Sequence, residues 1–196
     1  MENKHEVEYR ALISIDTFNK LLNNGKDNFP ESFSGPSIIT DAYFCQKNVK
    51  TFHGVEMNEV GSYSLRVRSE IKNDQTTVTL NTKTIKNKGD HNAWLENEIE
   101  VSSYEECKKI LEIIGFKVFF ELKKHRFSFM DGEINVCLED IENFQPAIEI
   151  EILTSVDKTE EAKSKLLGYF KKNNISEESI VKKSITNMLM REKASF

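Results

Sequence analysis

Charged residues occur at every second position in several segments of the chain. In the first segment, Glu6, Glu8 and Arg10 alternate with Val7 and Tyr9. Side chains two positions apart in a β-strand point to the same face of the sheet. The spacing therefore predicts a strand with one apolar face and one face that carries carboxylates and a guanidinium together.

The pattern recurs along the chain, and the charged positions separate by sign. The acidic positions are Glu6, Glu8, Glu98, Glu100, Glu149 and Glu151, and the basic positions are Arg66, Arg68, Lys83, Lys124 and Arg126. Any single strand of this kind is typical of the solvated face of an ordinary sheet, but the density of Glu and Arg in the whole set favours a shared site. Carboxylate oxygens are preferred ligands of Mg²⁺ and Mn²⁺, and arginine and lysine bind phosphate oxygens. The residues thus predict binding of a metal–phosphate complex.

Eight segments have the alternation expected of strands. They are residues 5–13, 38–46, 62–71, 75–84, 94–101, 117–129, 133–141 and 146–153. Short connections, including expected hairpin turns at Asn73-Asp74 and Asp131-Gly132, favour antiparallel neighbours. We predict an α+β fold, in which a closed eight-stranded antiparallel β-barrel, or tunnel, has a charged interior and flanking helices. Closure would remove exposed strand edges.

Amphipathic helices are expected to cover the apolar outer face of this barrel. Asp16 is expected to cap a short helix over residues 17–22, and Asp157 a helix whose apolar stripe is Ala162, Leu166, Tyr169 and Phe170. The segment Ser103–Glu106 has the spacing of a capping box, and Gly115 stands where that helix should end. Ser176 is expected to start a last helical segment.

Length and composition predict one domain over residues 1–196. A net charge of −5 argues against a nucleic-acid partner. Three widely spaced cysteines and the absence of a secretion signal or a long apolar run predict a cytoplasmic protein with no membrane partner. The sequence has no phosphate-binding glycine-rich loop and no histidine spacing typical of zinc sites.

Ordered motifs on the predicted strands resemble those of the CYTH, or triphosphate tunnel metalloenzyme, superfamily. This superfamily includes class IV adenylate cyclases, thiamine triphosphatases and inorganic triphosphatases. The motifs are Glu6-Val7-Glu8-Tyr9-Arg10, Asp41-Ala42-Tyr43-Phe44, Leu65-Arg66-Val67-Arg68, Thr79-Leu80-Asn81-Thr82-Lys83, Glu98-Ile99-Glu100, Lys124-His125-Arg126 and Glu149-Ile150-Glu151. The chain departs from the family pattern at Cys45, where Asp is usual, and at Leu138-Glu139, where Leu-Asp is usual. These departures leave the substrate open.

The resemblance implies a role for each of these charged residues. It implies Mg²⁺ or Mn²⁺ as cofactor, and binding of a small-molecule triphosphate. The implied metal ligands are Glu6, Glu8, Glu149, Glu151 and Glu139, and the implied phosphate-binding residues are Arg10, Arg66, Arg68, Lys83, Lys124 and Arg126. Glu98 and Glu100 would support the basic residues or a second metal. Lys83, held by Tyr43, would help to activate the attacking water.

Three functions are consistent with the sequence. The first is a metal-dependent phosphohydrolase that acts on inorganic triphosphate or on a small organic triphosphate such as thiamine or nucleoside triphosphate. The second is a class IV adenylate cyclase, which would convert ATP to cyclic AMP and pyrophosphate. The third is a polyphosphate- or nucleotide-binding module without catalytic activity. The resemblance also makes a homodimer plausible.

Overall fold

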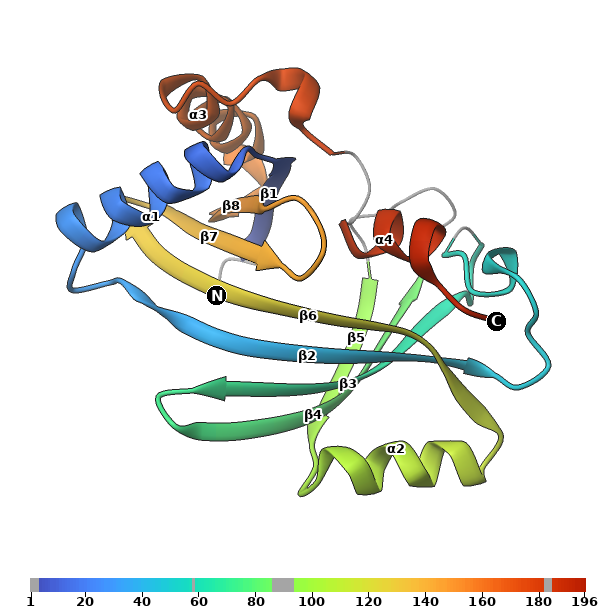
Figure 1. Cartoon of the computed structure of the whole chain (residues 1–196). Helices are drawn as coiled ribbons and strands as arrows, with labels where there is room; N and C mark the ends of the chain where they lie inside the picture. Colours follow the sequence, from blue (N-terminus) through green and yellow to red (C-terminus); the bar gives the residue numbers. More distant parts are fainter. Residues whose placement is uncertain (1–3, 58, 86–93, 182–184) are drawn as a thin grey trace. The chain divides into compact units, whose positions relative to one another are not determined.

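The computed structural model contains eight strands and four α-helices in the part of the chain that it describes (Figure 1). It describes residues 4–57, 59–85, 94–181 and 185–196, and for residues 4–6, 94, 96 and 156 it describes the backbone alone. The strands are β1 Lys4–Leu12, β2 Ser34–Gln46, β3 Tyr63–Lys72, β4 Gln75–Ile85, β5 Trp94–Glu100, β6 Phe116–Asp131, β7 Ile134–Ile141 and β8 Ala147–Ser155. The helices are α1 Ile15–Asn28, α2 Tyr104–Ile113, α3 Thr159–Lys172 and α4 Ile185–Lys193. All eight predicted strands are confirmed.

The strands form one sheet in the order β1-β8-β7-β6-β2-β3-β4-β5. The β3–β4 hairpin turns at Asn73-Asp74, where both residues have positive φ as a type I′ turn requires. The β6–β7 hairpin turns at Gly132 and Glu133, one residue later than predicted, because Asp131 is still paired with Ile134. Positive φ at Gly132 is a backbone conformation that favours glycine at this position.

The closed barrel is not confirmed by the hydrogen bonding. β1 and β5 are the two ends of the strand order, and within residues 4–57, 59–85, 94–181 and 185–196 no ladder joins them. The α+β class and the antiparallel sheet agree with the prediction. Closure depends on pairing between strands far apart in the chain, which the alternation within each strand does not specify.

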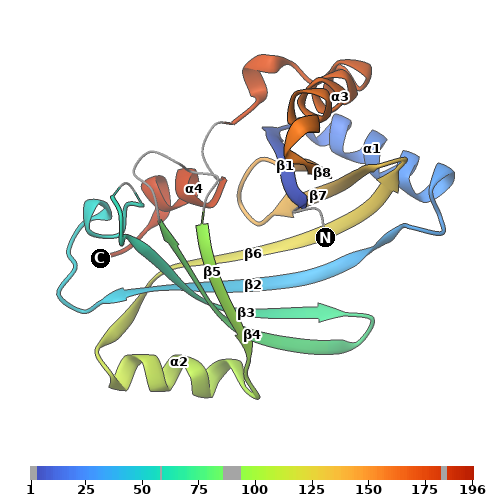
Figure 2. The same cartoon turned by 180° about the vertical axis from the view of Figure 1, so that it is seen from behind.

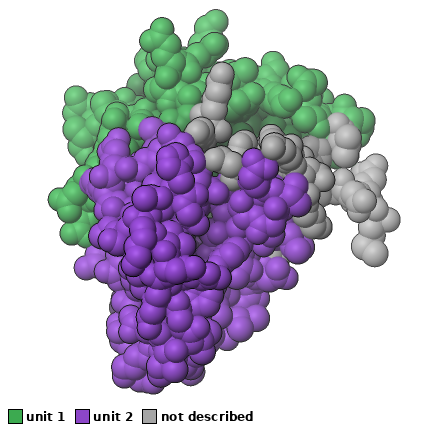
Figure 3. Space-filling view, turned by 90° about the vertical axis from the view of Figure 1, so that its right-hand side faces the viewer, with its two compact units in different colours: residues 1–37, 124–184 green, residues 38–123, 185–196 purple. Residues whose placement is uncertain are grey.

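The chain divides into two compact units, which Figure 3 shows in different colours. Unit 1 consists of residues 1–37 and 124–184, and unit 2 consists of residues 38–123 and 185–196. The long strands β2 and β6 each contribute residues to both units. Each unit is therefore described by itself.

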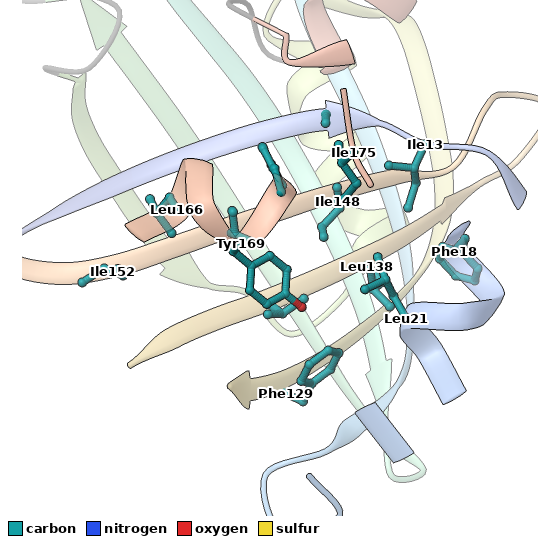
Figure 4. Close-up of a cluster of buried hydrophobic side chains, with 14 of the residues drawn as sticks. Ile13, Phe18, Leu21, Phe129, Leu138, Ile148, Ile152, Leu166, Tyr169 and Ile175 are labelled. Carbon is teal, nitrogen blue, oxygen red and sulfur yellow. The ribbon is translucent and has the colours of Figure 1, made fainter. Parts of the chain in front are cut away.

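Unit 1 has an apolar core on one face of β1, β8, β7 and the second half of β6 (Figure 4). Val7, Ile148 and Leu138 come from neighbouring strands and are buried. The helices α1 and α3 cover this face with Phe18, Leu21, Leu166 and Phe170. The stripe of α3 that the sequence predicted is buried as expected.

Unit 2 has a second core, on one face of β2, β3 and β4. The helix α2 packs beside β3 and β4 (Figure 2), and its Cys107 and Leu111 belong to the same buried cluster as Phe44 and Val67. Ser103 caps α2 by accepting a hydrogen bond from the Glu106 backbone N–H at 3.3 Å, and Gly115 has positive φ just after the helix. Both end signals of this helix are confirmed.

Two predicted helix starts were wrong. Helix α1 is capped by Ser14, whose Oγ accepts from the Thr17 backbone N–H at 3.2 Å, while Asp16 lies in the first turn, where a negative charge is favourable. This helix extends to Asn28, because Phe18, Leu21 and Gly25 pack into the core. Helix α3 starts at Thr159 after a 3₁₀ turn over Val156–Lys158, so that Asp157 does not cap it.

The segment after Ser176 also differs from the prediction. Ser176 caps a single 3₁₀ turn, Glu177–Ser179, by accepting from the Glu178 backbone N–H. Ile180 is extended and forms an isolated bridge with Ala11, so the helical segment does not continue through it. In the described part of the chain, no helix has the length and apolar character needed to cross a membrane.

A pair of helical glycines tests the packing of α1 on the sheet. A Cβ at Gly25 would lie 2.6 Å from Cδ1 of Phe129, whose ring is buried and stacks on Phe29 at 5.4 Å. We expect Gly25→Ala to lower the free energy of unfolding by about 1–3 kcal/mol, because the ring has little space to move. Chemical denaturation measures this change.

Gly168 in α3 provides the matched control. It is exposed, and a Cβ there meets no atom within 4 Å. Gly168→Ala should therefore raise the free energy of unfolding by roughly 0.5–1 kcal/mol, through helix propensity alone. Equal effects of the two substitutions would show that Gly25 is not required for close packing.

Candidate functional site

The polar face of unit 1 is a grid of side chains set by the strand register. Opposite residues on antiparallel strands share a face. One row across β1, β8, β7 and β6 is Arg10, Glu149, Cys137 and Ser128, and the next row is Glu8, Glu151, Asn135 and Met130. Glu139 and Arg126 lie in the row on the other side of Glu149. The polar face thus brings predicted metal ligands and predicted phosphate-binding residues together within one unit.

Three carboxylates of this face converge. Glu8, Glu149 and Glu151 each place one carboxylate oxygen within 4.8 Å of the other two. All three side chains are half-buried. Three hard oxygen ligands at this spacing fit a divalent cation such as Mg²⁺ or Mn²⁺.

Arg10 lies between two of these carboxylates. Its Nη2 donates to Glu8 Oε2 at 2.7 Å, and its Nε donates to Glu149. The pKa of Glu8 is raised, first by burial and also by Glu149 and Glu151, against the lowering effect of Arg10. Burial therefore keeps the pKa of Glu8 raised, although Arg10 lowers it. A divalent cation would add positive charge to a group that has three carboxylates and one guanidinium.

Glu139 is held by two basic side chains. Its Oε1 accepts from Lys124 Nζ at 2.6 Å and from Arg126 Nη2 at 2.6 Å. Burial opposes ionisation of Glu139, but Lys124 and Arg126 outweigh it and lower the pKa to about 2. Glu139 was predicted as a metal ligand, and the structure places it as the partner of these two cations.

The two groups on this face carry opposite excess charge. Glu8, Glu149 and Glu151 with Arg10 have three negative charges and one positive charge, whereas Glu139 with Lys124 and Arg126 has one negative charge and two positive charges. The groups occupy adjacent rows, and two residues along a strand span about 7 Å. An acidic group and a basic group thus lie side by side on this face.

Two residues of this face were not among the predicted site residues. Asn135 donates from Nδ2 to Glu151 Oε1 at 2.7 Å and so orients one of the three carboxylates. Cys137 is opposite Glu149, and burial raises the pKa of its thiol to about 12, so that it stays protonated. Asn135 and Cys137 could have been identified from the sequence. They alternate with Glu139, a predicted site residue, and so lie on the same face of the strand.

Unit 2 has a polar face of its own. One row is Tyr43, Arg66, Asn81 and Glu98, the next is Asp41, Arg68, Thr79 and Glu100, and Ser64 is opposite Lys83. This face includes the remaining predicted phosphate-binding residues, Arg66, Arg68 and Lys83. Asn81 donates to Glu98 at 3.4 Å and is buried.

A buried carboxylate organises the two arginines of unit 2. Asp41 is fully buried and accepts from Arg68 Nε at 2.7 Å and from Nη2 at 2.8 Å. Nε of Arg66 lies 3.9 Å from Asp41 and is a buried donor that has no hydrogen-bond partner among the described residues. The sequence motif included Asp41, but no role was predicted for it. An unsatisfied guanidinium donor on a polar face fits an anion.

Tyr43 and Lys83, the two predicted catalytic residues, lie on neighbouring rows of this face. Tyr43 is opposite Arg66, and its ring packs against Phe120 at 5.9 Å. Burial, followed by the charge of Asp41, raises the pKa of Tyr43, so its hydroxyl remains a hydrogen-bond donor. Lys83 is half-buried on the face shared by Ser64.

Two of the remaining predicted residues lie at exposed positions. Glu98 and Glu100 are exposed on β5, and Glu98 lies 4.0 Å from Arg66. The backbone of Glu6 pairs with Leu153, but its side chain lies outside the described part of the structure. His125 is exposed, as expected for a side chain that alternates away from Lys124 and Arg126.

The chain resembles several solved structures, whereas a search of curated proteins found no match. The PH1819 protein of Pyrococcus horikoshii OT3 has a similar fold, with a TM-score of 0.72 at 22% identity over 96% of this chain and 99% of that chain. A protein of Vibrio parahaemolyticus, named provisionally as an adenylate cyclase, has a TM-score of 0.67 at 16% identity over 96% and 99% of the two chains. Another provisional adenylate cyclase, from Bacillus halodurans, has a TM-score of 0.60 at 17% identity over 96% and 98%.

The family itself is identified from the sequence. Residues 4–185 match the CYTH domain, and this range contains every predicted site residue. It includes the carboxylates of unit 1 and the arginines of unit 2. The chain therefore belongs to the CYTH domain family.

Proposed function

We propose that the protein is a metal-dependent triphosphatase that hydrolyses a small-molecule triphosphate. The observation that carries this proposal is the pair of adjacent groups on the polar face of unit 1. One has excess negative charge around Glu8, Glu149 and Glu151, and the other has excess positive charge around Lys124 and Arg126. A metal–triphosphate complex contains a cation, which the first group would bind, and negative phosphates, which the second group would bind.

Each group of residues would have a separate role. Glu8, Glu149 and Glu151 would hold the cation, and Asn135 would keep Glu151 oriented. Arg10, Lys124 and Arg126 would donate hydrogen bonds to phosphate oxygens. In unit 2, the family motifs assign phosphate binding to Arg66, Arg68 and Lys83, which lie on the polar face of that unit. Basic groups fixed before the substrate arrives stabilise developing negative charge without further reorganisation.

Glu8, Glu149 and Glu151 would hold a divalent cation, which would supply positive charge to neutralise the charge that develops as the phosphorus–oxygen bond breaks. Water would attack the terminal phosphorus, and the bond from this phosphorus to the bridging oxygen would break. The diphosphate part of the substrate would be the leaving group, the terminal phosphoryl group would become orthophosphate, and a proton of the water would pass to solvent.

The family motifs assign the activation of the attacking water to Lys83, held by Tyr43, and within unit 2 the two residues lie on neighbouring rows of one face. Glu98 and Glu100 would orient the basic residues of unit 2 or hold a second metal, and Glu98 lies 4.0 Å from Arg66.

Cyclisation of ATP is the second candidate. The similarity to two proteins provisionally named as adenylate cyclases favours it. In that reaction the ribose 3′-hydroxyl attacks the α-phosphorus and pyrophosphate leaves. The products separate the two candidates, because a hydrolase releases orthophosphate from ATP and a cyclase releases pyrophosphate together with cyclic AMP.

Loss of one carboxylate tests the metal site. We expect Glu8→Gln to weaken Mn²⁺ binding by at least about tenfold. Loss of a residue that only orients a metal ligand can already weaken metal binding by this factor. Orthophosphate release from inorganic triphosphate, ATP and thiamine triphosphate should fall in parallel. Calorimetric titration with Mn²⁺ and a phosphate assay measure the two effects.

The exposed Glu142 supplies a matched control, because it lies outside the three-carboxylate group. Glu142→Gln should leave Mn²⁺ affinity and turnover unchanged. If Glu8→Gln binds Mn²⁺ as tightly as the wild type does, the assignment of the metal site is wrong. If the wild type releases neither orthophosphate nor pyrophosphate from any of the three compounds, both enzymatic candidates fail.

The ion pairs of Glu139 predict a pH-dependent stability. Its pKa is about 2 in the folded protein, below the usual value of 4.5, so the unfolded chain binds more protons between these values. Ionised Glu139 therefore stabilises the fold above about pH 4.5, by an amount on the order of 3 kcal/mol. This contribution should decrease as the pH falls from 4.5 toward 2.

Urea denaturation of the wild type and Glu139→Gln at several pH values measures this contribution. The difference in the free energy of unfolding should be greatest near neutral pH and should shrink below about pH 4.5. A difference that does not depend on pH would mean that Glu139 is not held as an ionised partner of Lys124 and Arg126.

A further inference from the structure

Arg10 bridges two members of the three-carboxylate group of unit 1. Its Nη2 donates to Glu8 Oε2 at 2.7 Å, and its Nε donates to Glu149 Oε2. One side chain can do this because the five N–H donors of a guanidinium point outward in one plane. Two of the three carboxylates are therefore hydrogen-bonded to the same positive charge.

The same carboxylates are the candidate ligands of a divalent cation. Glu8, Glu149 and Glu151 each place one oxygen within 4.8 Å of the other two. Glu151 is held by a neutral donor, because it accepts from Asn135 Nδ2 at 2.7 Å. Glu8 and Glu149 are instead held by the charge of Arg10. A divalent cation would compete with Arg10 for these two ligands, and the two positive charges would repel each other.

The ion pairs of Arg10 are partly exposed to water. The side chains of Arg10, Glu8 and Glu149 are 30%, 29% and 28% exposed. The carboxylate of the basic group, Glu139, is 11% exposed. Opening of a partly solvated ion pair costs less than opening of a buried one, which leaves an uncompensated buried charge. Release of a cation is therefore easier at Glu8 and Glu149 than at Glu139.

A released Arg10 would lie close to the basic group. Glu149 is on β8, between the strand of Arg10 and the strand of Glu139, and Glu139 is one row further along. Neighbouring strands lie about 4.8 Å apart, and adjacent rows are separated by about 7 Å. A chain of phosphates held by Lys124 and Arg126 would thus come within reach of the long side chain of Arg10, whose charged donors bind phosphate oxygens well.

We infer that Arg10 exchanges partners when a divalent cation binds, and that it thereby couples the metal site to the phosphate site. In the free protein Arg10 binds Glu8 and Glu149. After the exchange its donors bind phosphate oxygens beside Lys124 and Arg126. The inference rests on the proposed function and specifies the form of the substrate, because the protein would bind the metal complex of a triphosphate more tightly than the free triphosphate. By linkage, each ligand would raise the affinity for the other by the same factor.

The N–H signals of two arginines test the exchange without any turnover. Protein labelled with ¹⁵N is titrated with Mg²⁺, which is diamagnetic, and the Nε–H resonances are followed by NMR. We expect Mg²⁺ alone to move the resonance of Arg10, because its Nε loses the hydrogen bond to Glu149. Nε of Arg126 donates to Glu139 at 3.0 Å and is the internal control. Its resonance should move only when a triphosphate analogue is added, in which CH₂ groups replace both bridging oxygens and prevent hydrolysis.

Two charge-conserving variants measure the coupling. Arg10→Lys keeps the positive charge, but an ammonium group does not have the planar donors that bridge two carboxylates. Calorimetry gives the affinities for Mg²⁺ and for the analogue, each alone and in the presence of the other. We expect Arg10→Lys to bind Mg²⁺ alone more tightly and to bind the analogue alone as the wild type does. With Mg²⁺ present, it should bind the analogue at least about fivefold more weakly, which is the lower end of typical coupling factors.

Arg126→Lys is the matched control, because Arg126 pairs with Glu139 and not with the three carboxylates. It should weaken binding of the analogue by the same factor with and without Mg²⁺, and it should leave the affinity for Mg²⁺ alone unchanged. Circular dichroism checks that both variants are folded. The same Arg→Lys substitutions assign the two NMR signals.

The outcomes separate this inference from the proposed function. An Arg10 signal that Mg²⁺ moves, together with a coupling that Arg10→Lys reduces, supports the inference even if no triphosphate is hydrolysed. An Arg10 signal that Mg²⁺ leaves in place would overturn it, as would a folded Arg10→Lys that loses affinity for the analogue equally with and without Mg²⁺. Release of orthophosphate from a triphosphate would then leave the proposed function intact. If Mg²⁺ does not bind and no orthophosphate is released, both are wrong.

Discussion

The repulsion between neighbouring carboxylates is the constraint on which the polar face of unit 1 depends. The strand register places Glu8 opposite Glu151 and brings Glu149 next to both. Burial is the first cause of the raised pKa of Glu8, and the charges of Glu149 and Glu151 add to it. Arg10 opposes this shift by donating to Glu8 and Glu149. The group has three carboxylates and one guanidinium, and under the proposed function a divalent cation would balance this excess of negative charge.

The opposite face of the same strands keeps these charges in position. Val7, Ile148 and Ile150 are buried against α1 and α3 and alternate with the charged residues. A shift of the register by one residue would turn every carboxylate toward this apolar core, so burial of the core enforces the arrangement of the site. Unit 2 follows the same principle, since α2 covers the face opposite Arg66 and Arg68. The packing of the helices is therefore a condition for the site and not only for stability.

Much of the fold and part of the site could be predicted because period-two alternation is a local property of the sequence. It identified all eight strands and placed Glu8 and Arg10 on one face. It could not identify partners across strands, so the pairing of Glu139 with Lys124 and Arg126, and the burial of Asp41 beside Arg68, were not anticipated. The start of α1 at Ser14 depended on one side-chain hydrogen bond, for which Asp16 was an equally good candidate by residue type.

Burial of charged side chains costs free energy, and both units nevertheless contain buried ion pairs. Stability alone does not explain the presence of these charged residues. Hydrophobic residues of similar size often stabilise a protein as well as a buried ion pair does. The Nε donor of Arg66 carries a further cost, because a buried donor without a hydrogen bond destabilises the fold by about 1–3 kcal/mol. A bound phosphate oxygen would satisfy this donor, so part of the cost would be recovered only in the complex. Under the proposed function, the unsatisfied Nε donor of Arg66 would be fixed in advance for an anion, at a cost to the unliganded protein.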